Sequence, residues 1–143
     1  MKAVISISGT QGIVGDDSST IELITDGIYT AIPDGYAVKY KESELTGLEG
    51  TTTTVEVTSA GVSVERRGWL NSRMDFSEGQ KTSFLYDTQF GSATLGVDTR
   101  KITSEFNERG GKLCIDYIVN MEHLVAMKNR LTVTIRKQGA QQQ

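Results

Sequence analysis

The chain has 143 residues, of which 37% are hydrophobic and 23% are charged, and its formal net charge is -3. This length fits one domain, residues 1–143, with a sizeable core. The acidic balance gives no general attraction to nucleic acid or to an anionic membrane, and no apolar run approaches the roughly 20 residues of a membrane span. A single cysteine excludes an internal disulfide and favours a reducing compartment, so we expect a cytoplasmic protein that binds neither nucleic acid nor membrane.

An alternating segment opens the chain, and a glycine-rich segment follows it. Apolar side chains alternate from Ala3 to Ile7, which predicts a first strand and argues against a signal peptide. Residues 9–19 hold Gly, Asp and Ser at short intervals, so we predict a flexible surface loop. The Gly-x-x-Gly-x-x-Gly pattern there does not indicate a phosphate loop, because Asp16 and Asp17 follow it where a helix N-terminus is needed. Two carboxylates suit a weak divalent-cation site, but a solvated loop is the favoured interpretation.

The next segments predict a broken strand, a turn and a regular strand. Leu23 and Ile28 are out of phase with each other, so we expect a bulge or break at Gly27. A turn is predicted at residues 32–35, where Pro, Asp and Gly follow one another. Residues 36–40 alternate aromatic or apolar side chains with polar ones, which is typical of a strand.

Residues 51–135 repeat a short apolar/polar alternation that ends each time at turn residues. Such spacing predicts an antiparallel meander with hairpin-length connections, and a meander of this length closes on itself. The predicted fold is therefore all-β, a single closed antiparallel barrel of about ten strands. Residues 121–128 fit either a strand extension or one helical turn, and the Gln-rich residues 138–143 are predicted to form a frayed tail.

Several short motifs recur in a fixed order through the second two-thirds of the chain. They are Gly50-Thr51-Thr52-Thr53-Thr54, Arg66-x-Gly68, Met74-x-Phe76-x-x-Gly79, Tyr86-x-Thr88-x-Phe90-Gly91, Thr99 and Gly110-Gly111-x-Leu113-x-Ile115-x-Tyr117. In this order and spacing they resemble the YwiB-like family of bacterial proteins, a domain of unknown function. The resemblance implies a lipocalin-like, calycin-like barrel. It implies no activity, because the family is itself uncharacterised.

The residue inventory lacks the common catalytic sets. His123 and Cys114 are the single histidine and cysteine, so neither a Cys/His zinc site nor a Cys-x-x-Cys redox pair can form. A Ser-His-Asp triad would have to use His123, yet the chain has no nucleophile elbow, and a surface histidine is the favoured interpretation. Cys114 is out of phase with Leu113 and Ile115, so we predict an outward, inert thiol. We expect no enzyme, no metal and no cofactor.

Six polar side chains stand in phase with the apolar, inward residues of their strands. Arg66, for example, shares the face of Val62 and Val64. Several of the six lie toward one end of their strand, where a barrel would gather them at a rim or in its interior. The candidate ligand-binding set is Tyr40, Arg66, Tyr86, Thr88, Thr99 and Tyr117.

Two interpretations of this set stay open. An inward guanidinium among hydroxyls can hold the anionic head group of a small, partly apolar ligand, because it binds a carboxylate or a phosphate through two hydrogen bonds. Alternatively Arg66 pairs with Glu42, which continues the phase of Tyr40, and the set is a structural rim. A buried arginine without any anion would cost several kcal/mol, so one of the two anions is required.

The leading hypothesis is thus a non-enzymatic intracellular barrel that binds a small ligand. The alternative is a structural or protein-interaction module, a homodimer whose barrel is filled by its own side chains. A cavity of roughly 300 Å³ or more would favour the first hypothesis. Outward apolar residues favour a homodimer through an outer sheet face, and they are Cys114, Ile118 and Leu85 on two strands and Trp69 and Leu70 in a predicted turn.

Overall fold

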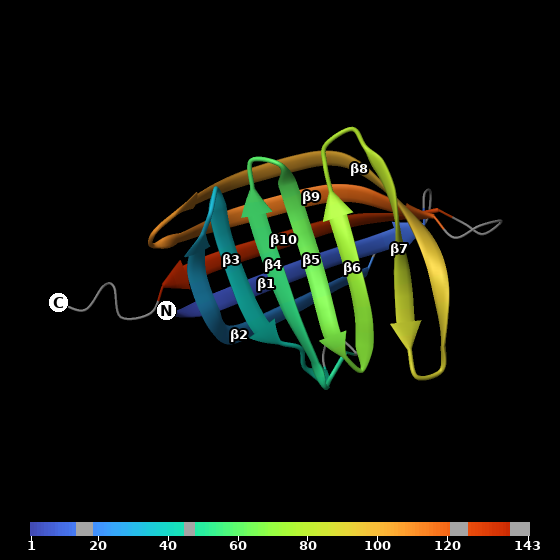
Figure 1. Cartoon of the computed structure of the whole chain (residues 1–143), viewed down its shortest axis with the longest axis horizontal. Coiled ribbons are helices and arrows are strands. Elements are labelled where there is room, and N and C mark those ends of the chain that lie inside the picture. The colour runs from blue at the N-terminus through green and yellow to red at the C-terminus, as the bar shows by residue number, and fades with distance from the viewer. Residues whose placement is uncertain (14–18, 45–47, 121–125, 138–143) are drawn as a thin grey trace.

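The computed structural model describes residues 1–13, 19–44, 48–120 and 126–137, and nearly all of them belong to ten antiparallel strands. The strands close into one barrel in the order β1-β10-β9-β8-β7-β6-β5-β4-β3-β2 (Figure 1). The all-β fold and the closed ten-stranded barrel that the sequence predicts are confirmed. The strands are β1 (Lys2–Ile13), β2 (Ser19–Ile32), β3 (Gly35–Lys41), β4 (Thr51–Thr58), β5 (Gly61–Gly68), β6 (Leu70–Phe76), β7 (Lys81–Thr88), β8 (Gly91–Asn107), β9 (Gly110–Asn120) and β10 (Met127–Lys137).

Alternate residues of each strand point inward, and they fill the barrel. Ile5, Leu113 and Ile115 are completely buried, as the strand phase read from the sequence requires. The void among Tyr29, Tyr36 and the neighbouring described core side chains has a volume of about 10 Å³. Tyr29 and Tyr36 stack with ring centroids 5.2 Å apart, and Phe106 lies against both rings. The centre of the barrel is therefore packed by the protein's own side chains.

Strand β1 is longer than the sequence predicts. Gly9 to Ile13 pair with β10, and Gly9 to Gln11 also pair with β2, so these residues form a strand and not the first part of the loop expected at 9–19. Residues 9–12 have small or polar side chains, so the sequence shows no apolar alternation there. The strand forms nevertheless, because the backbone makes its hydrogen bonds. Ser19 likewise begins β2. Asp16 and Asp17 lie outside the described residues, as do His123 and the tail 138–143.

The break predicted at Gly27 is wrong, because β2 runs without interruption through this position. Gly27 points inward, and a Cβ atom there would collide with the Ile5 side chain and the Lys39 carbonyl oxygen. Ile28 points outward and is 47% exposed, so an outward apolar side chain produced the apparent change of phase. A bulge lies instead in β8, between Thr99 and Lys101.

Two further segments differ from the expectation or complete it. Leu70, expected in a turn, begins β6 and is 1% exposed, because the connection from β5 consists of Trp69 alone. Met127 and Lys128 belong to β10, which settles the strand alternative for the end of the ambiguous segment 121–128; residues 121–125 lie outside the described part of the chain.

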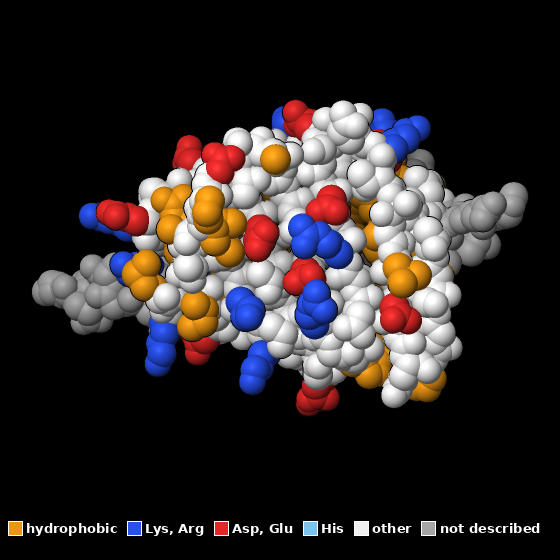
Figure 2. Space-filling model, viewed as in Figure 1, with side chains coloured by type: hydrophobic (Ala, Val, Ile, Leu, Met, Phe, Trp, Pro, Cys, Tyr) orange, Lys and Arg blue, Asp and Glu red, His pale blue; other side chains and the backbone are white. Residues whose placement is uncertain are grey.

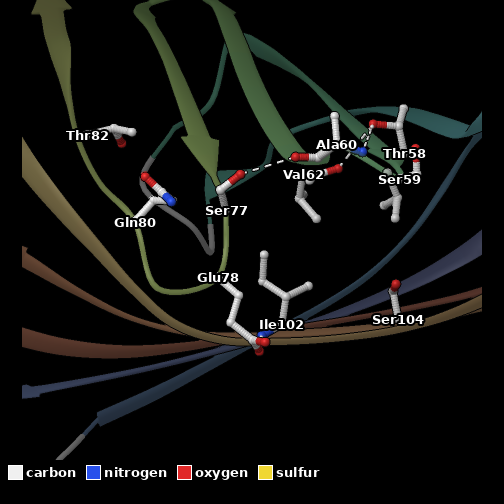
Figure 3. A pocket seen from close by; sticks show the side chains of 12 residues that line it. Thr58, Ser59, Ala60, Val62, Ser77, Glu78, Gln80, Thr82, Ile102 and Ser104 are labelled. Carbon is white, nitrogen blue, oxygen red and sulfur yellow. Dashed lines mark hydrogen bonds between the residues drawn. The ribbon is translucent and has the colours of Figure 1, made fainter.

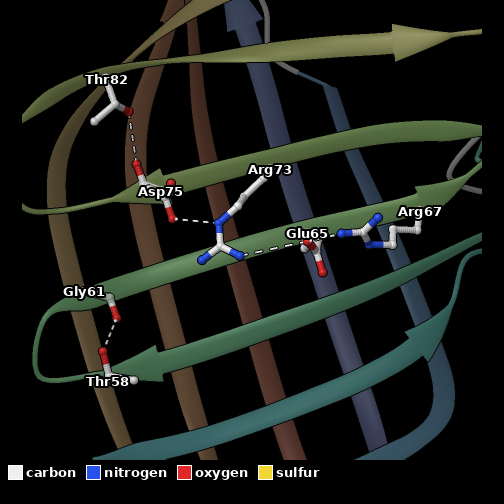
Figure 4. A network of polar contacts seen from close by, with 7 residues as sticks. All are labelled: Thr58, Gly61, Glu65, Arg67, Arg73, Asp75 and Thr82. Atoms are coloured by element: carbon white, nitrogen blue, oxygen red, sulfur yellow. Dashed lines mark hydrogen bonds and ion pairs between the residues drawn. The ribbon is translucent and has the colours of Figure 1, made fainter.

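The barrel wall is weakest between β6 and β7. This boundary, here called the β6–β7 seam, has only two paired positions, Leu70 with Thr88 and Asn71 with Asp87. Further along the seam the Thr82 hydroxyl donates a hydrogen bond of 3.1 Å to the Asp75 carbonyl (Figure 4). One side-chain hydrogen bond thus joins the two strands in the part of the seam without paired positions.

The outer face of β5 and β6 is covered by charges of both signs. Glu65 contacts Arg67 at 3.0 Å and Arg73 at 3.9 Å, and Arg73 also contacts Asp75 at 3.4 Å (Figure 4). Figure 2 shows the same alternation of acidic and basic side chains across this face. Exposed pairs of this kind contribute little to stability. They make the face a solvated, charge-balanced surface.

Candidate functional site

The strand register brings three of the predicted side chains, Tyr40, Arg66 and Tyr117, to one end of the barrel. Tyr40 of β3 lies opposite Thr53 of β4, and Thr53 lies opposite Arg66 of β5, so the three form a row along the inner face. Opposed residues in such a row have Cβ atoms about 4.5–5.5 Å apart. On the facing wall, Tyr117 of β9 lies opposite Asn129 of β10. Figure 1 shows β3, β4 and β5 in front of β9 and β10.

These two rows border a cavity of about 200 Å³, here called the mouth cavity. Its walls combine polar groups with aliphatic ones, which suits a ligand that has a charged end and an apolar body. The polar groups include the two tyrosines, one carboxylate and two guanidinium groups. The residues that line it are Ile7, Gly9, Thr10, Gln11, Ser19, Ile21, Leu23, Tyr40, Glu42, Leu48, Arg66, Tyr117, Asn129, Arg130 and Leu131.

Arg66 and Glu42 form a loose ion pair at the base of this cavity. Arg66 Nε lies 3.8 Å from Glu42 Oε2, and the side chains are 20% and 3% exposed. The Thr53 hydroxyl donates a hydrogen bond of 2.5 Å to the same carboxylate oxygen. A distance of 3.8 Å is too long for a hydrogen bond. Nε of Arg66 is buried, and it has no hydrogen-bond partner within the described part of the chain.

The two tyrosines of the cavity keep their protons at ordinary pH. Burial, and secondarily the Glu42 carboxylate, raises the pKa of Tyr40, although Arg66 opposes the shift. Burial also raises the pKa of Tyr117, again against the influence of Arg66. The Tyr117 ring meets the edge of Phe76 with centroids 4.8 Å apart, which holds it against the core. Both hydroxyl groups are therefore neutral, and the Tyr40 side chain hydrogen-bonds the Glu42 carboxylate and Thr53.

Arg130 lies at the rim of the mouth cavity and is already paired. Its Nε and a terminal nitrogen donate hydrogen bonds of 2.6 and 3.2 Å to the two carboxylate oxygens of Asp116. The Asp116 hydrogen bond and charge raise the pKa of Arg130, and the side chain is 62% exposed. The lining contains two arginines, and among the described residues Arg66 is the one without a hydrogen-bonded carboxylate.

The other three predicted site residues do not line the mouth cavity. Thr99 is 1% exposed, and its backbone makes hydrogen bonds of 2.9 and 3.0 Å with Gly79 and Gln80. Tyr86 is 37% exposed on β7. The Thr88 hydroxyl donates a hydrogen bond to the Gly91 carbonyl at 3.2 Å, within the β7–β8 turn. The register nevertheless places Thr99 directly opposite Tyr117, so Thr99 lies in the same row as Tyr117 and Asn129 without lining the cavity.

Thr53 and Asn129 belong to the site although the sequence analysis did not select them. Thr53 is 0% exposed and Asn129 is 9% exposed. Each is polar and in phase with buried neighbours, Val55 in one strand and Val133 in the other, so the same signal that selected Arg66 could have found them. Glu42, named only as an alternative partner, proves to be the carboxylate beside Arg66.

A second cavity, of about 520 Å³, opens at the other end of the barrel beside the β4–β5 turn. Figure 3 shows Val62 and Ile102 on facing sides of this space. Its polar groups are used within the protein: Ser77 donates to the Ala60 carbonyl, and Glu78 accepts a hydrogen bond of 2.9 Å from the Ile102 amide. The larger cavity thus contains no buried charge, and the mouth cavity is the stronger candidate site.

Among the residues that the structure describes, no group of three or more His, Cys, Asp or Glu side chains could hold a metal ion. No helix in the same residues is long and apolar enough to cross a membrane.

The fold and the mouth cavity together define the class: a closed ten-stranded antiparallel β-barrel with a packed centre and an ionic recess at one end. Residues 5–133 match the family described as "Domain of unknown function (DUF1934)", and the chain belongs to that family. The uncharacterized beta-barrel protein YwiB of Bacillus subtilis (strain 168) is 29% identical over 139 residues, which cover 94% of this chain and 88% of YwiB.

The crystal structure of the ywiB protein from Bacillus subtilis superposes on this barrel with a TM-score of 0.85. The match covers 95% of this chain and 91% of that one, at 23% sequence identity. The likeness confirms the fold and the YwiB-like resemblance read from the motifs. The family itself is one of unknown function, so function has to be argued from the site.

Proposed function

We propose that this protein binds a small anionic molecule with a short apolar body in the mouth cavity. The observation that carries the proposal is the buried Nε of Arg66, which has no hydrogen-bond partner among the described residues. A buried donor without a partner costs about 1–3 kcal/mol, and more when it is charged. A ligand oxygen that accepts from the Arg66 guanidinium would remove this cost and gain two parallel hydrogen bonds.

The surroundings of Arg66 support an amphipathic ligand. Tyr117 offers a neutral hydroxyl group, while Ile7, Leu23 and Leu131 offer apolar walls. The volume of about 200 Å³ lies below the roughly 300 Å³ that would favour a ligand-binding barrel over a filled one. The support for binding is therefore the buried Arg66 donor and not the cavity size, and the proposed ligand is small. We place this binding at the rim of a lipocalin-like barrel in the bacterial cytoplasm, on the strength of the single cysteine and the Bacillus relative.

Isothermal titration calorimetry with sodium hexanoate tests the proposal. The wild-type protein should bind, and Arg66→Met should lose binding by at least about tenfold, the effect of one charge-assisted contact. Arg66→Lys keeps the charge near Glu42 but lacks the planar fork, so it should also bind more weakly. Arg67→Met is the matched control, because the neighbouring side chain is 76% exposed on the outer face.

The proposal fails if wild-type protein shows no heat of binding at hexanoate concentrations up to the millimolar range. It also fails if Arg66→Met and Arg67→Met bind hexanoate equally well. Circular dichroism of each variant at the titration temperature establishes that the protein tested is folded.

A second candidate function is a homodimer through an outer sheet face, favoured by the exposed apolar residues of β2. Ile24 is 74% exposed and Ile28 is 47% exposed. Of the outward residues that the sequence predicts, Leu85 is 52% and Trp69 is 38% exposed, whereas Cys114 and Ile118 are only partly exposed. Sedimentation velocity tests it: a dimer that Ile24→Ser converts to monomer supports the candidate. A monomer at all concentrations up to about 100 μM contradicts it.

A further inference from the structure

We infer that the ligand of the mouth cavity is a monoanion of the carboxylate type, and that Glu42 is the residue that excludes dianions such as phosphate monoesters. The inference rests on the proposed function and adds to it a ligand class and a specificity-determining residue. It follows from the balance of charges around Arg66.

Among the described charged residues of the lining, Arg66 and Glu42 lack a hydrogen-bonded partner of opposite charge. Arg130, the other cation in the lining, is held by both carboxylate oxygens of Asp116. Arg66 carries one positive charge, and Glu42 Oε2 lies 3.8 Å from its Nε. A bound monoanion leaves this group of three charges at -1, whereas a bound dianion leaves it at -2. The second charge of a dianion therefore meets no cation in the cavity.

Burial makes the repulsion from Glu42 effective. Its side chain is 3% exposed, so little water screens its charge from a ligand on the other side of the guanidinium. Thr53 donates to the carboxylate and holds it in position. Tyr40 and Tyr117 are neutral, so they cannot offset a second negative charge, and the Tyr40 side chain already hydrogen-bonds Glu42 and Thr53. Like charges placed this way act as a device against the wrong ligand.

Shape favours the same ligand class. The planar fork of one guanidinium matches the two coplanar oxygens of a carboxylate, and sites for phosphate dianions usually gather several cations or backbone N–H groups. The volume of about 200 Å³ has room for roughly seven groups of the size of water, at about 30 Å³ each. Short alkyl or aromatic carboxylates fall in this range.

Hexanoate and hexyl phosphate form a matched pair of probes with the same alkyl chain. At pH 8 the phosphate monoester carries two charges, because its second pKa is about 6. We expect wild-type protein to bind hexanoate at least about tenfold more tightly than hexyl phosphate in calorimetric titrations. Glu42→Gln, which keeps an acceptor for Thr53, should reduce this preference by at least about tenfold.

The control is Glu65→Gln, which removes a carboxylate from the outer face of the same region, where Glu65 pairs with Arg67 and Arg73. It should leave the preference unchanged. A measurement on wild-type protein keeps the test valid if Glu42→Gln does not fold. Hexyl phosphate should bind about tenfold more tightly at pH 5.5, where it is mostly a monoanion, than at pH 8, with hexanoate titrated in parallel as the reference.

The outcomes separate the two proposals. If neither probe binds wild-type protein, the proposed function itself fails. If both probes bind equally well and neither Glu42→Gln nor the change of pH alters their ratio, the site stands and the role of Glu42 is refuted. If the preference exists and disappears in Glu42→Gln alone, Glu42 is the specificity-determining residue.

Discussion

The Arg66–Glu42 pair gives the sharpest prediction about stability. Two unit charges 3.8 Å apart interact by about 4 kcal/mol at an effective dielectric constant of about 20. This value is an upper limit, because the Arg66 side chain is 20% exposed and water screens part of the interaction. The distance also excludes a hydrogen bond between the two groups. We therefore expect a coupling free energy of about 1–2 kcal/mol.

The single variants should be more destabilised than the double variant. Arg66→Met leaves the buried Glu42 carboxylate with the Thr53 hydroxyl but without a cation, and we expect a loss of about 2–3 kcal/mol. This is less than the roughly 3–5 kcal/mol of a fully buried pair, because Thr53 still solvates the carboxylate. In the Arg66→Met, Glu42→Gln double variant no charge is left buried, so its free energy of unfolding should be higher than that of Arg66→Met.

Urea denaturation followed by circular dichroism measures all four proteins of this double-mutant cycle. Arg67→Met is the control for loss of an arginine, and it should change the free energy of unfolding by less than about 0.5 kcal/mol, since its side chain is 76% exposed. If the two substitutions are additive within about 0.3 kcal/mol, the pair does not interact and the reasoning about the mouth cavity is refuted.

Three further predictions concern other parts of the barrel. The pKa is raised for the buried Tyr29 and Tyr40 and for the partly buried Tyr117, so the folded state keeps their protons above pH about 10, where exposed tyrosines ionise. Stability should therefore be level below that pH and fall above it by about 1.4 kcal/mol per pH unit for each of the three. Absorbance at 295 nm should show these tyrosines ionising only on unfolding. Gly27→Ala should lower the free energy of unfolding, measured by urea denaturation, by more than about 1 kcal/mol. Gly9→Ala should lower it by under about 0.5 kcal/mol, because a Cβ atom there meets nothing within 4 Å. Equal effects would contradict the packing described at Gly27. The amide of Asp75 faces the β6–β7 seam, and the amide of Met74 faces β5. In hydrogen exchange the Asp75 amide should therefore exchange about a hundredfold faster than the Met74 amide. Equal protection of the two amides would mean that the seam is closed.

Strand phase is the part of the fold that the sequence predicts well. Leu113 and Ile115 alternate with polar neighbours, and both are completely buried. The same rule places Arg66 inward after Val62 and Val64, and it places Glu42 on the face of Tyr40. Side-chain alternation carries this information because one face of each strand has to be apolar.

Side-chain alternation gives wrong predictions where outward side chains are apolar or inward side chains are small. Ile28 points outward and suggested a break that does not exist, and Gly9 begins a paired segment that has almost no apolar side chains. Phase also does not fix the height of a residue along the barrel, which depends on the register between strands. Tyr86 was expected together with Arg66, but β6–β7 pairing ends at Asn71 with Asp87, and Tyr86 is 37% exposed and does not line the mouth cavity. Register requires pairings between distant parts of the chain, and a single sequence does not reveal them.

The Nε–H resonance of Arg66 tests the central claim most directly, because this buried donor has no acceptor among the described residues. Nuclear magnetic resonance of 15N-labelled protein detects it, and the spectrum of Arg66→Lys assigns it by its absence. On titration with hexanoate the Arg66 resonance should shift progressively and saturate, while that of the exposed Arg67 should stay in place. An Arg66 resonance that does not move at millimolar hexanoate, or shifts confined to exposed arginines, would contradict an anion site at Arg66.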